Sequence, residues 1–450
     1  MGTTAPVAGP GFQGLIQRFL GAPRAAHPLA TDPAPVRDLP PSDSLTLFLG
    51  RSEVRGPRVS PTVAADDEIA AGQPVATLGP APHRPSPAPG TVLAVRQVPD
   101  VRGGKPGLAV LLRASGNAAP PFPRMDGSSA SPEMIRSRLR EAGAAAADLP
   151  GGADSVVVLA ADPEPGLSSV LRQLLDDPDA AVRATGLIAR LTGAARAVLA
   201  VPEPHAPALR EVGDGRGVEI LPLRPEYPAT LPEVVVRAVA AGGARPALAS
   251  LADAIDALEA IELGRVPSSR LITVLAPGGT VAGNFRVLIG TPLGDVLSAA
   301  GVQAAPGDRI VTGGPLRGLA QYSLDAAVDG GVSAVAVMKA GSFPDWSDEP
   351  CVNCGTCIDA CPEGLQAHQL ARLSEFGLFD RTPDYGLDEC IECGLCATVC
   401  PARRPLLQRI RLAKREVAAA RRPDPEAVAP APAPREPDPV PVPVAAGRKD

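Results

Sequence analysis

The chain has 450 residues, a length typical of about three domains, and a net charge of −6, which argues against a nucleic-acid-binding protein. No stretch approaches the roughly 20 consecutive apolar residues that cross a bilayer, so we expect no transmembrane segment. The N-terminus lacks the charged start, apolar run and cleavage site of a signal peptide, so we expect no export.

Proline is concentrated at both ends of the chain. Residues 1–41 and 423–450 hold 17 of the 54 prolines. Segments of this composition bury too little apolar surface to fold, so we predict disordered tails at 1–45 and 423–450. GPGFQG at 9–14 fits the dinucleotide pattern G-x-G-x-x-G, but no strand precedes it, and we interpret it as a chance match.

Residues 46–116 alternate short apolar runs with Gly and Pro turns, which predicts a small all-β module. The run DDEIAAGQPVATL, followed by SPAPGTVLAV, resembles the barrel-sandwich fold of biotinyl and lipoyl domains. A carrier domain of that kind needs a lysine on the hairpin between its halves, and residues 51–104 contain none. We therefore expect this module to be structural or to form a docking surface.

Residues 117–264 alternate predicted helices with apolar strands. A helix begins after Ser131, whose hydroxyl suits a helix cap. Strands are predicted at 155–161, 196–202 and 218–223, and helices at 166–192, 205–212 and 231–241. This alternation predicts a Rossmann-like, doubly wound parallel sheet with helices on both faces.

A ligand of such a sheet binds at the carboxyl ends of the strands. The residues expected there are Asp162, Glu164 and the turn at 202–205, which together form a candidate ligand site. GDGRG at 213–217 precedes a strand instead of opening a helix, so we interpret it as a turn and not as a nucleotide site.

Residues 265–340 predict a β-grasp module of the SLBB-like kind, with two strands around a Gly turn, a helix and a further strand. The Gly-rich stretch at 313–318 has two interpretations. It forms either a tight turn, which we favour, or a close approach of the backbone to a ligand.

The eight cysteines form two copies of C-x2-C-x2-C-x3-C-P, in CVNCGTCIDACP and CIECGLCATVCP. This run is typical of two-cluster bacterial ferredoxins, in which the fourth cysteine of each run binds the other cluster. We predict a helical dicluster domain at 341–422. One [4Fe-4S] cluster is assigned to Cys351, Cys354, Cys357 and Cys400, and the other to Cys390, Cys393, Cys396 and Cys361.

Two alternatives concern these cysteines. A zinc ribbon also uses C-x2-C pairs, but it does not need a third cysteine and a fourth before proline, twice over. The clusters could instead have a structural role; we favour electron transfer because crossed ligation holds the two clusters close together.

Two further features flank the motifs. The insert at 362–389 has Leu365, Leu370, Leu373 and Phe376 at helical spacing, which predicts a helix packed on the cluster domain. We expect His368, within it, to be exposed or capping. Residues 403–422 form a predicted helix with eight basic residues and one acidic residue. This helix has two interpretations. It is either a docking face, for an acidic redox partner such as ferredoxin or for an anionic membrane surface, or it is a solvated helix face.

The order of these parts resembles the C subunit of the Rnf ion-translocating electron transport complex, a relative of the flavin- and NADH-binding subunit of respiratory complex I. The resemblance covers about 46–418. The stretches that carry it are GQ at 72–73, PGTV at 89–92, PEYP at 225–228, RLITV at 270–274, IGTP at 289–292, GGPLRG at 313–318 and the PC-x2-C start at 350.

The resemblance implies a peripheral subunit on the cytoplasmic side of the bacterial inner membrane, with other membrane and iron-sulfur subunits as partners. It also implies electron exchange among NADH, FMN and two [4Fe-4S] clusters in a ferredoxin:NAD type oxidoreductase. In the family, the helix ending in EAG runs into a glycine-rich flavin loop. Here Gly143 is followed by four alanines. The family has a second motif with a carboxylate, a cysteine and Glu-Pro, and the matching stretch here, Asp162-Pro163-Glu164-Pro165, keeps only the Glu-Pro intact.

Three functional hypotheses follow. The leading one is an electron-transfer subunit with two [4Fe-4S] clusters, whose flavin and NADH site is altered. The alternative is a subunit in which FMN and NADH still bind, so that it converts two-electron to one-electron transfer. The third is a scaffold with structural clusters.

Overall fold

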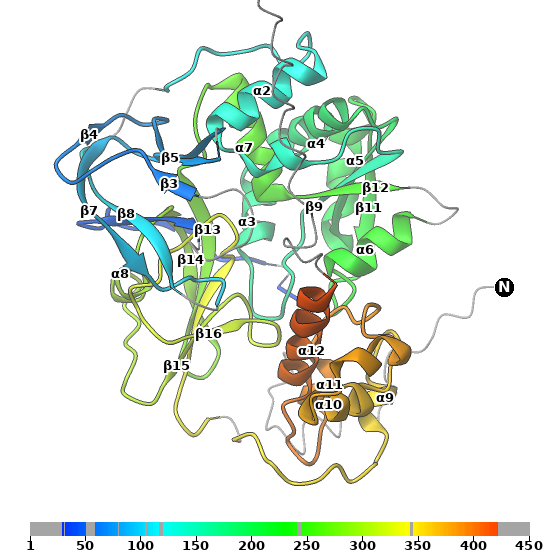
Figure 1. The fold of residues 1–450 in the computed structure, drawn as a ribbon. Helices are drawn as coiled ribbons and strands as arrows, with labels where there is room; N and C mark the ends of the chain where they lie inside the picture. The colour runs from blue at the N-terminus through cyan, green and yellow to red at the C-terminus, as the bar shows by residue number, and fades with distance from the viewer. Residues whose placement is uncertain are drawn as a thin grey trace, which may run out of the picture.

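The computed structural model describes residues 29–421 apart from residues 31, 51–58, 80, 104–105, 117–119, 241–244 and 343–344. In Figure 1 a blue β module lies beside a mixed sheet, a green α/β unit lies on the other side of that sheet, and an orange helical region follows. The predicted tail at 423–450 and the match at 9–14 lie outside the described residues.

The β module consists of two small antiparallel sheets. In one, β2, β8, β7 and β4 are neighbours; in the other, β3, β5 and β6. Alternate residues of a strand face one side, and apolar ones from both sheets meet in a core around Leu47, Val75 and Leu112. The strands are β2 (Leu45–Gly50), β3 (Val59–Pro61), β4 (Glu68–Ile69), β5 (Pro74–Leu78), β6 (Ala81–Pro85), β7 (Gly90–Val98) and β8 (Gly107–Ala114).

The mixed sheet has six strands in the order β1-β14-β13-β17-β15-β16, and α8 (Leu293–Ala299) packs against it. Its core is centred on Ile272, Val274 and Phe285. The strands are β1 (Val36–Asp38), β13 (Ser269–Ala276), β14 (Thr280–Leu288), β15 (Arg309–Thr312), β16 (Leu319–Gln321) and β17 (Ala334–Met338).

The expectation of disorder over the whole of 1–45 is wrong for its later part. Strand β1 pairs in parallel with β14, and the buried Leu29 donates its backbone N–H to the carbonyl of Pro225 at 2.9 Å. A segment of three residues can be ordered here without a core of its own, because the edge of the mixed sheet supplies its hydrogen bonds.

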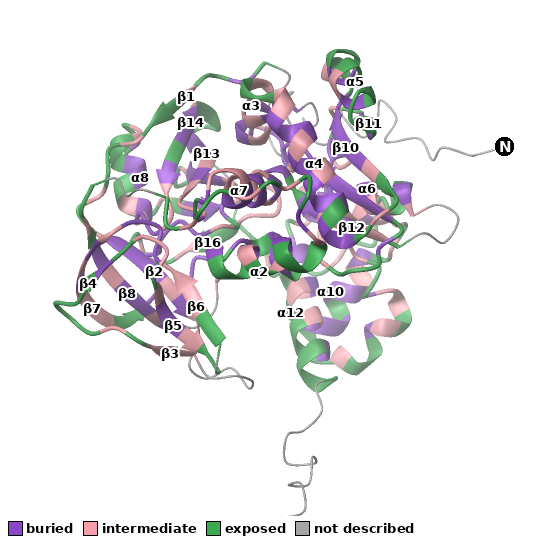
Figure 2. Ribbon diagram, turned by 90° about the horizontal axis from the view of Figure 1, so that it is seen from above, coloured by how far each residue is buried: buried purple, intermediate pink, exposed green. Residues whose placement is uncertain are grey.

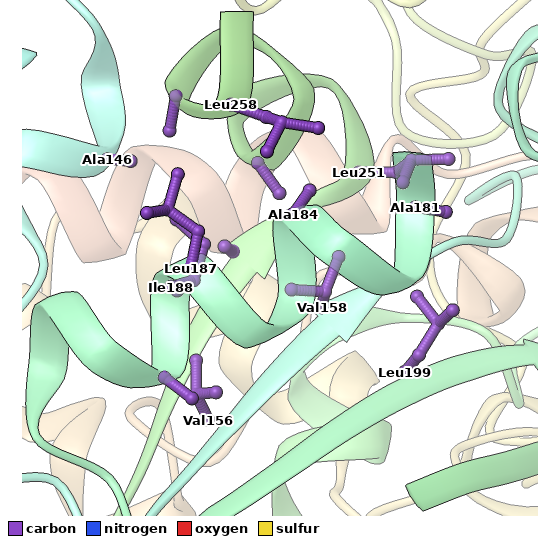
Figure 3. Close-up of a cluster of buried hydrophobic side chains, with 14 of the residues drawn as sticks. Ala146, Val156, Val158, Ala181, Ala184, Leu187, Ile188, Leu199, Leu251 and Leu258 are labelled. Atoms are coloured by element: carbon purple, nitrogen blue, oxygen red, sulfur yellow. The ribbon is translucent and has the colours of Figure 1, made fainter. Parts of the chain in front are cut away.

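The α/β unit contains a parallel sheet in the order β11-β10-β9-β12, with helices on both faces. Strand β9 is buried along its whole length. Figure 3 shows one face, where Val156 and Val158 meet Leu187 and Leu258 from two helices. The elements are α2 (Pro132–Ala142), η2 (Ala145–Asp148), β9 (Ser155–Leu159), α3 (Ser169–Asp176), α4 (Pro178–Thr192), β10 (Arg196–Pro202), η3 (Glu203–His205), α5 (Ala206–Asp214), β11 (Val218–Leu223), α6 (Pro232–Val239), β12 (Pro246–Ser250) and α7 (Leu251–Glu262).

Most of the expected elements of this unit are present. Ser131 caps α2 by accepting the backbone N–H of Met134, and GDGRG at 213–217 comprises the last two residues of α5 and the turn before β11. The expectation of a single helix over 166–192 is wrong. The segment forms two helices, because Asp177 leaves the helical conformation before Pro178 and caps α4 instead.

Strand β12 and helix α7 were not predicted from the sequence. The strand PALAS has no β-branched or aromatic residue, so nothing in its composition predicts a strand. It adds to the free edge of β9 through parallel pairing, and the residues of α7 are either buried or intermediate, as its colours in Figure 2 show.

The helical region packs α10 against α12 through Leu370, Leu407, Ile410 and Ala413. The helix predicted in the insert is confirmed, but Phe376 lies just beyond its end with 67% of its surface exposed. The elements are α9 (Thr356–Asp359), α10 (Ala367–Glu375), η4 (Phe379–Arg381), η5 (Pro383–Tyr385), α11 (Leu395–Thr398) and α12 (Leu406–Ala420). No helix among the described residues is long and apolar enough to cross a membrane.

Candidate metal centre

The two cysteine motifs fold into loops of the same shape. Gly355 and Gly394 both have a left-handed backbone, with φ of 80° and 79°, and they begin the short helices α9 and α11. Asn353 and Glu392, between the first two cysteines of each loop, are also left-handed, with φ of 52° and 54°. Glycine is favoured at 355 and 394 because a side chain is strained at this φ. At Gly394 a Cβ would also lie 2.8 Å from the carbonyl oxygen of Leu316.

The eight thiols lie around two separate cavities, with four at each. The fourth cysteine of each motif lines the cavity of the other motif. We call the first set the outer site; it comprises Cys351, Cys354, Cys357 and Cys400. We call the second set the inner site; it comprises Cys361, Cys390, Cys393 and Cys396. The structure therefore brings together the two ligand sets expected from the motif.

The donor set fits iron-sulfur clusters. All eight cysteines are free thiols, and thiolate is the ligand that holds [4Fe-4S] clusters. Within the described part of the chain, no group of three or more His, Cys, Asp or Glu side chains converges in a way that would hold a single metal ion. Burial raises the pKa of Cys390, and that of Cys393 to about 12. Iron binds the thiolate form of cysteine, so cluster binding must release the protons that burial favours on these thiols.

The outer site opens to solvent. Its cavity has a volume of about 330 Å³, and Cys354 is exposed. Val352 and Phe376 line this cavity and are 66% and 67% exposed. The thiols of the outer site therefore have exposed apolar side chains beside them.

The inner cavity is lined by residues of the helical region, including Leu370, Leu407 and Ile410, and the α/β unit and the mixed sheet pack against its cysteine loop. Ile391, Cys393 and Leu395 share a buried cluster with Tyr227 and Leu316. The hydroxyl of Tyr227 donates to the carbonyl of Cys393 at 2.5 Å. Three segments that are far apart in the sequence thus meet at the second cysteine loop.

The candidate ligand residues Asp162 and Glu164 are buried and already bonded within the chain. The carboxylate of Asp162 accepts the backbone N–H groups of Val170 and Leu171 at 3.0 Å each, at the start of α3. Burial nevertheless raises the pKa of Asp162 to about 6. The third element of the predicted site, the turn at 202–205, contains η3, over Glu203–His205. The carboxylates of Asp162 and Glu164 are thus occupied by backbone N–H groups of the same chain.

Contact with the carboxylate of Glu164 accounts for glycine in the stretch at 313–318. Its carboxylate accepts the backbone N–H of Leu316 at 2.6 Å and that of Arg317 at 3.1 and 3.2 Å. A Cβ on Gly314 would lie 2.2 Å from this carboxyl group. The turn therefore approaches a side chain of the same protein, and it carries Leu316 to the inner site.

The basic residues of 403–422 mostly bind acidic groups of the same chain. Glu375 pairs with Arg404 and Arg409, and Glu392 pairs with Arg411 and Lys414. Arg421 pairs with Asp388 in the same way. Lys414 also donates to the carbonyl of Cys390 at 2.5 Å. Arg411 and Lys414 therefore hold the second cysteine loop against α12, whereas Arg404 and Arg409 bind α10.

The alanines after Gly143 are part of the core. Ala144, Ala146 and Ala147 are buried, and the segment forms the η2 turn. The N–H of Ala147 bonds to the carbonyl of Ala144, and Arg136 donates to the carbonyl of Ala147. A backbone N–H used inside the turn is not available to a phosphate group.

Of the residues that pack against the second cysteine loop, Tyr227 was not a candidate site residue, and Leu316 lies in the Gly-rich stretch at 313–318, for which a tight turn was favoured. Both lie in stretches that carried the family resemblance, PEYP and GGPLRG. No local pattern in either stretch predicts contact with a cysteine loop more than 70 residues away in sequence.

Comparison with known proteins agrees with the cysteine pattern. Residues 350–403 match the family model of the 4Fe-4S dicluster domain. The chain is 27% identical over 350 residues to the C subunit of the ion-translocating oxidoreductase complex of Rhodobacter capsulatus, covering 70% of this chain and 67% of that protein. It is also 27% identical to the C subunit of the Na(+)-translocating ferredoxin:NAD(+) oxidoreductase complex of Acetobacterium woodii, covering 60% of this chain and 64% of that protein.

A crystal structure of an NAD+-reducing [NiFe]-hydrogenase in the H2-reduced state aligns with a TM-score of 0.41 at 16% identity, covering 67% of this chain and 68% of that one. The chain spans about two thirds of the length of the two relatives named above. The chain is thus similar to the C subunits of ion-translocating oxidoreductase complexes over about two thirds of its length, and its residues 350–403 match the 4Fe-4S dicluster domain.

Proposed function

We propose that this protein is a peripheral electron-transfer subunit of an Rnf-type, ion-translocating membrane complex. Two [4Fe-4S] clusters would carry single electrons between a soluble donor or acceptor and the membrane subunits. The observation that carries the proposal is the division of eight free thiols into two crossed sets of four, around two cavities. The names of the similar proteins support the membrane complex as the setting.

The two sites differ in a way that suits conduction. Leu316 and Tyr227 pack against the second cysteine loop, so this loop of the inner site faces the mixed sheet and the α/β unit. The outer site has an exposed ligand in Cys354 and an open cavity, which suits exchange with another protein. When bound, each cluster would supply one-electron redox chemistry, and the chain would supply its position and its access to solvent.

We propose that the flavin and NADH site of the family is altered in this protein. The support is the buried η2 turn, where alanine methyl groups fill the core and the backbone N–H of Ala147 is used within the turn. A phosphate-binding loop needs free N–H groups and close backbone approach, which glycine permits and alanine restricts. FMN and NADH binding is the alternative.

The finer assignments are also part of this proposal. The β module would be a barrel-sandwich hybrid at 46–116, the parallel α/β unit a Rossmann-like domain at 117–264, and the mixed sheet a β-grasp domain at 265–340. The cluster domain would occupy 341–422. The protein would bind at the cytoplasmic face of the bacterial inner membrane, with other subunits of the complex and an acidic ferredoxin as partners.

Anaerobic spectroscopy of the purified full chain tests the proposal. We expect roughly eight irons per chain, a reversible paramagnetic signal on reduction with dithionite, and no flavin. NADH alone should leave the cluster absorbance unchanged. Prompt bleaching by NADH would support the FMN and NADH alternative, and the absence of any reversible signal would support clusters with a structural role.

A further inference from the structure

Two polar side chains lie against thiols of the outer site. Nδ1 of His368 is 3.8 Å from Sγ of Cys357, and Oγ1 of Thr356 is 2.7 Å from Sγ of Cys354. Both side chains also line the outer cavity. His368, expected to be exposed or capping, is instead half-buried on the first turn of α10 with its ring toward the cysteine loop.

The inner site has no such groups. The residue at the position of Thr356 in the second motif is Leu395, which has no donor. His368 belongs to the insert between the motifs, and no insert follows the second motif, which runs directly into α12. Within the part of the chain that the structure describes, the hydrogen bonds from side chains to cysteine sulfur are these two. The two cysteine loops have the same backbone shape. They differ in the side-chain donors to cysteine sulfur, which lie at the outer site.

A thiolate ligand can only accept hydrogen bonds, so the hydroxyl of Thr356 and the protonated Nδ1 of His368 must be the donors. Reduction adds negative charge to a cluster and its thiolates. A donor to sulfur therefore stabilises the reduced form more than the oxidised form, and this raises the reduction potential.

We propose that His368 and Thr356 donate hydrogen bonds to the Cys357 and Cys354 thiolates and thereby raise the reduction potential of the outer cluster selectively. The inference rests on the proposed function, because it requires a cluster at each site. It makes His368 and Thr356 positioning and tuning residues of the outer site, outside the set of iron ligands.

The test is a potentiometric titration of the full-length protein with both clusters, followed by electron paramagnetic resonance under anaerobic conditions. Cys354→Ser identifies the outer wave as the one that moves or disappears. In His368→Leu and in Thr356→Val, this same wave should shift to more negative potential while the inner wave stays in place. We expect at least a threefold change in the reduction equilibrium constant for each, which is about 28 mV for a one-electron couple.

Conservative variants separate tuning from a loss of packing. His368→Asn places an amide N–H near the position of Nδ1, and Thr356→Ser keeps the hydroxyl, so both should return the outer wave close to the wild-type potential. Gln369→Leu changes the next residue of α10, does not line the cavity, and should leave both waves unchanged.

The possible results are distinct. If the outer wave does not move in His368→Leu and Thr356→Val, or moves equally in His368→Asn, this inference is wrong while the two-cluster assignment stands. If the protein holds no cluster at the outer site, the proposed function fails and the inference fails with it. Iron content and circular dichroism of each variant establish which case applies.

Discussion

The carboxylate of Glu164 accepts the backbone N–H of Leu316 at 2.6 Å, and Leu316 in turn packs beside the inner-site cysteine loop. This contact connects the carboxyl end of β9 to the cluster domain through a single loop of the mixed sheet. A carboxylate expected to bind a ligand thus holds the parts of the protein together instead.

Glu164→Gln should destabilise this connection. Oε2 of the carboxylate accepts the N–H groups of Leu316 and Arg317, and Oε1 accepts that of Arg317 as well. Glutamine replaces one oxygen by an NH2 group and makes the other neutral, and hydrogen bonds to a charged group contribute about 1.5–3 kcal/mol, so the thermal midpoint should fall. Glu211→Gln, at an exposed glutamate, is the matched control and should not change the midpoint. Equal midpoints for the two variants would contradict the role of Glu164.

Tyr227→Phe should loosen the cover of the inner site. The change removes only the hydroxyl that donates to the carbonyl of Cys393, at a cost of about 1 kcal/mol or more because the acceptor is left buried. We expect faster loss of one cluster to an iron chelator, followed by absorbance. Tyr322→Phe removes the same atom at an exposed position and should have no effect. Identical chelation rates in both variants would argue against a covering role for Tyr227.

Cys361→Ser and Cys400→Ser test the crossed assignment. Cys361 lies in the first motif but lines the inner cavity, whereas Cys400 lies in the second motif but lines the outer cavity. Cys400→Ser should therefore disturb the cluster that reacts fastest with chelators, since the outer site is open, and Cys361→Ser should disturb the slower one. The reverse pattern would show that each fourth cysteine binds within its own motif.

Lys414→Met should weaken the binding of the inner cluster more than it changes the docking of a partner protein on α12. Lys414 binds the carbonyl of Cys390 and the carboxylate of Glu392, so its loss leaves both with fewer partners. We expect a lower thermal midpoint and faster release of the inner cluster. Arg415→Met, an exposed neighbour on α12, should behave as the wild type in both measurements. If the thermal midpoint fell equally in Lys414→Met and Arg415→Met, the loss of a positive charge on α12 would explain the result without a specific role for Lys414.

Asp162 should make stability depend on pH. Burial raises its pKa in the folded protein to about 6, above the ordinary value of 3.8. The folded state therefore holds this proton more tightly than the unfolded state, and stability is lost as the pH rises through 6. Between pH 5 and 7.5 the loss is on the order of 1 kcal/mol. Thermal midpoints at the two pH values should differ less in Asp162→Asn than in the wild type, and an equal difference would contradict the raised pKa.

Local patterns in the sequence were sufficient for the cysteine loops and for most of the α/β unit. The spacing of Cys351 to Cys361, repeated at Cys390 to Cys400, is itself a constraint on chemistry, because thiols that bind a cubane must follow one another at short intervals. Strands such as 196–202 and the cap at Ser131 are also local, since periodicity and capping involve residues a few positions apart.

Contacts between distant segments were decided only by the tertiary structure. That Glu164 binds Leu316, that Glu392 takes up Arg411 and Lys414, and that His368 turns toward Cys357 depend on how separately folded units pack. A carboxylate or an imidazole carries the same chemistry whether it faces a ligand, solvent or a backbone N–H. The sequence by itself therefore determined which groups could bind iron, and packing decided which polar groups support them.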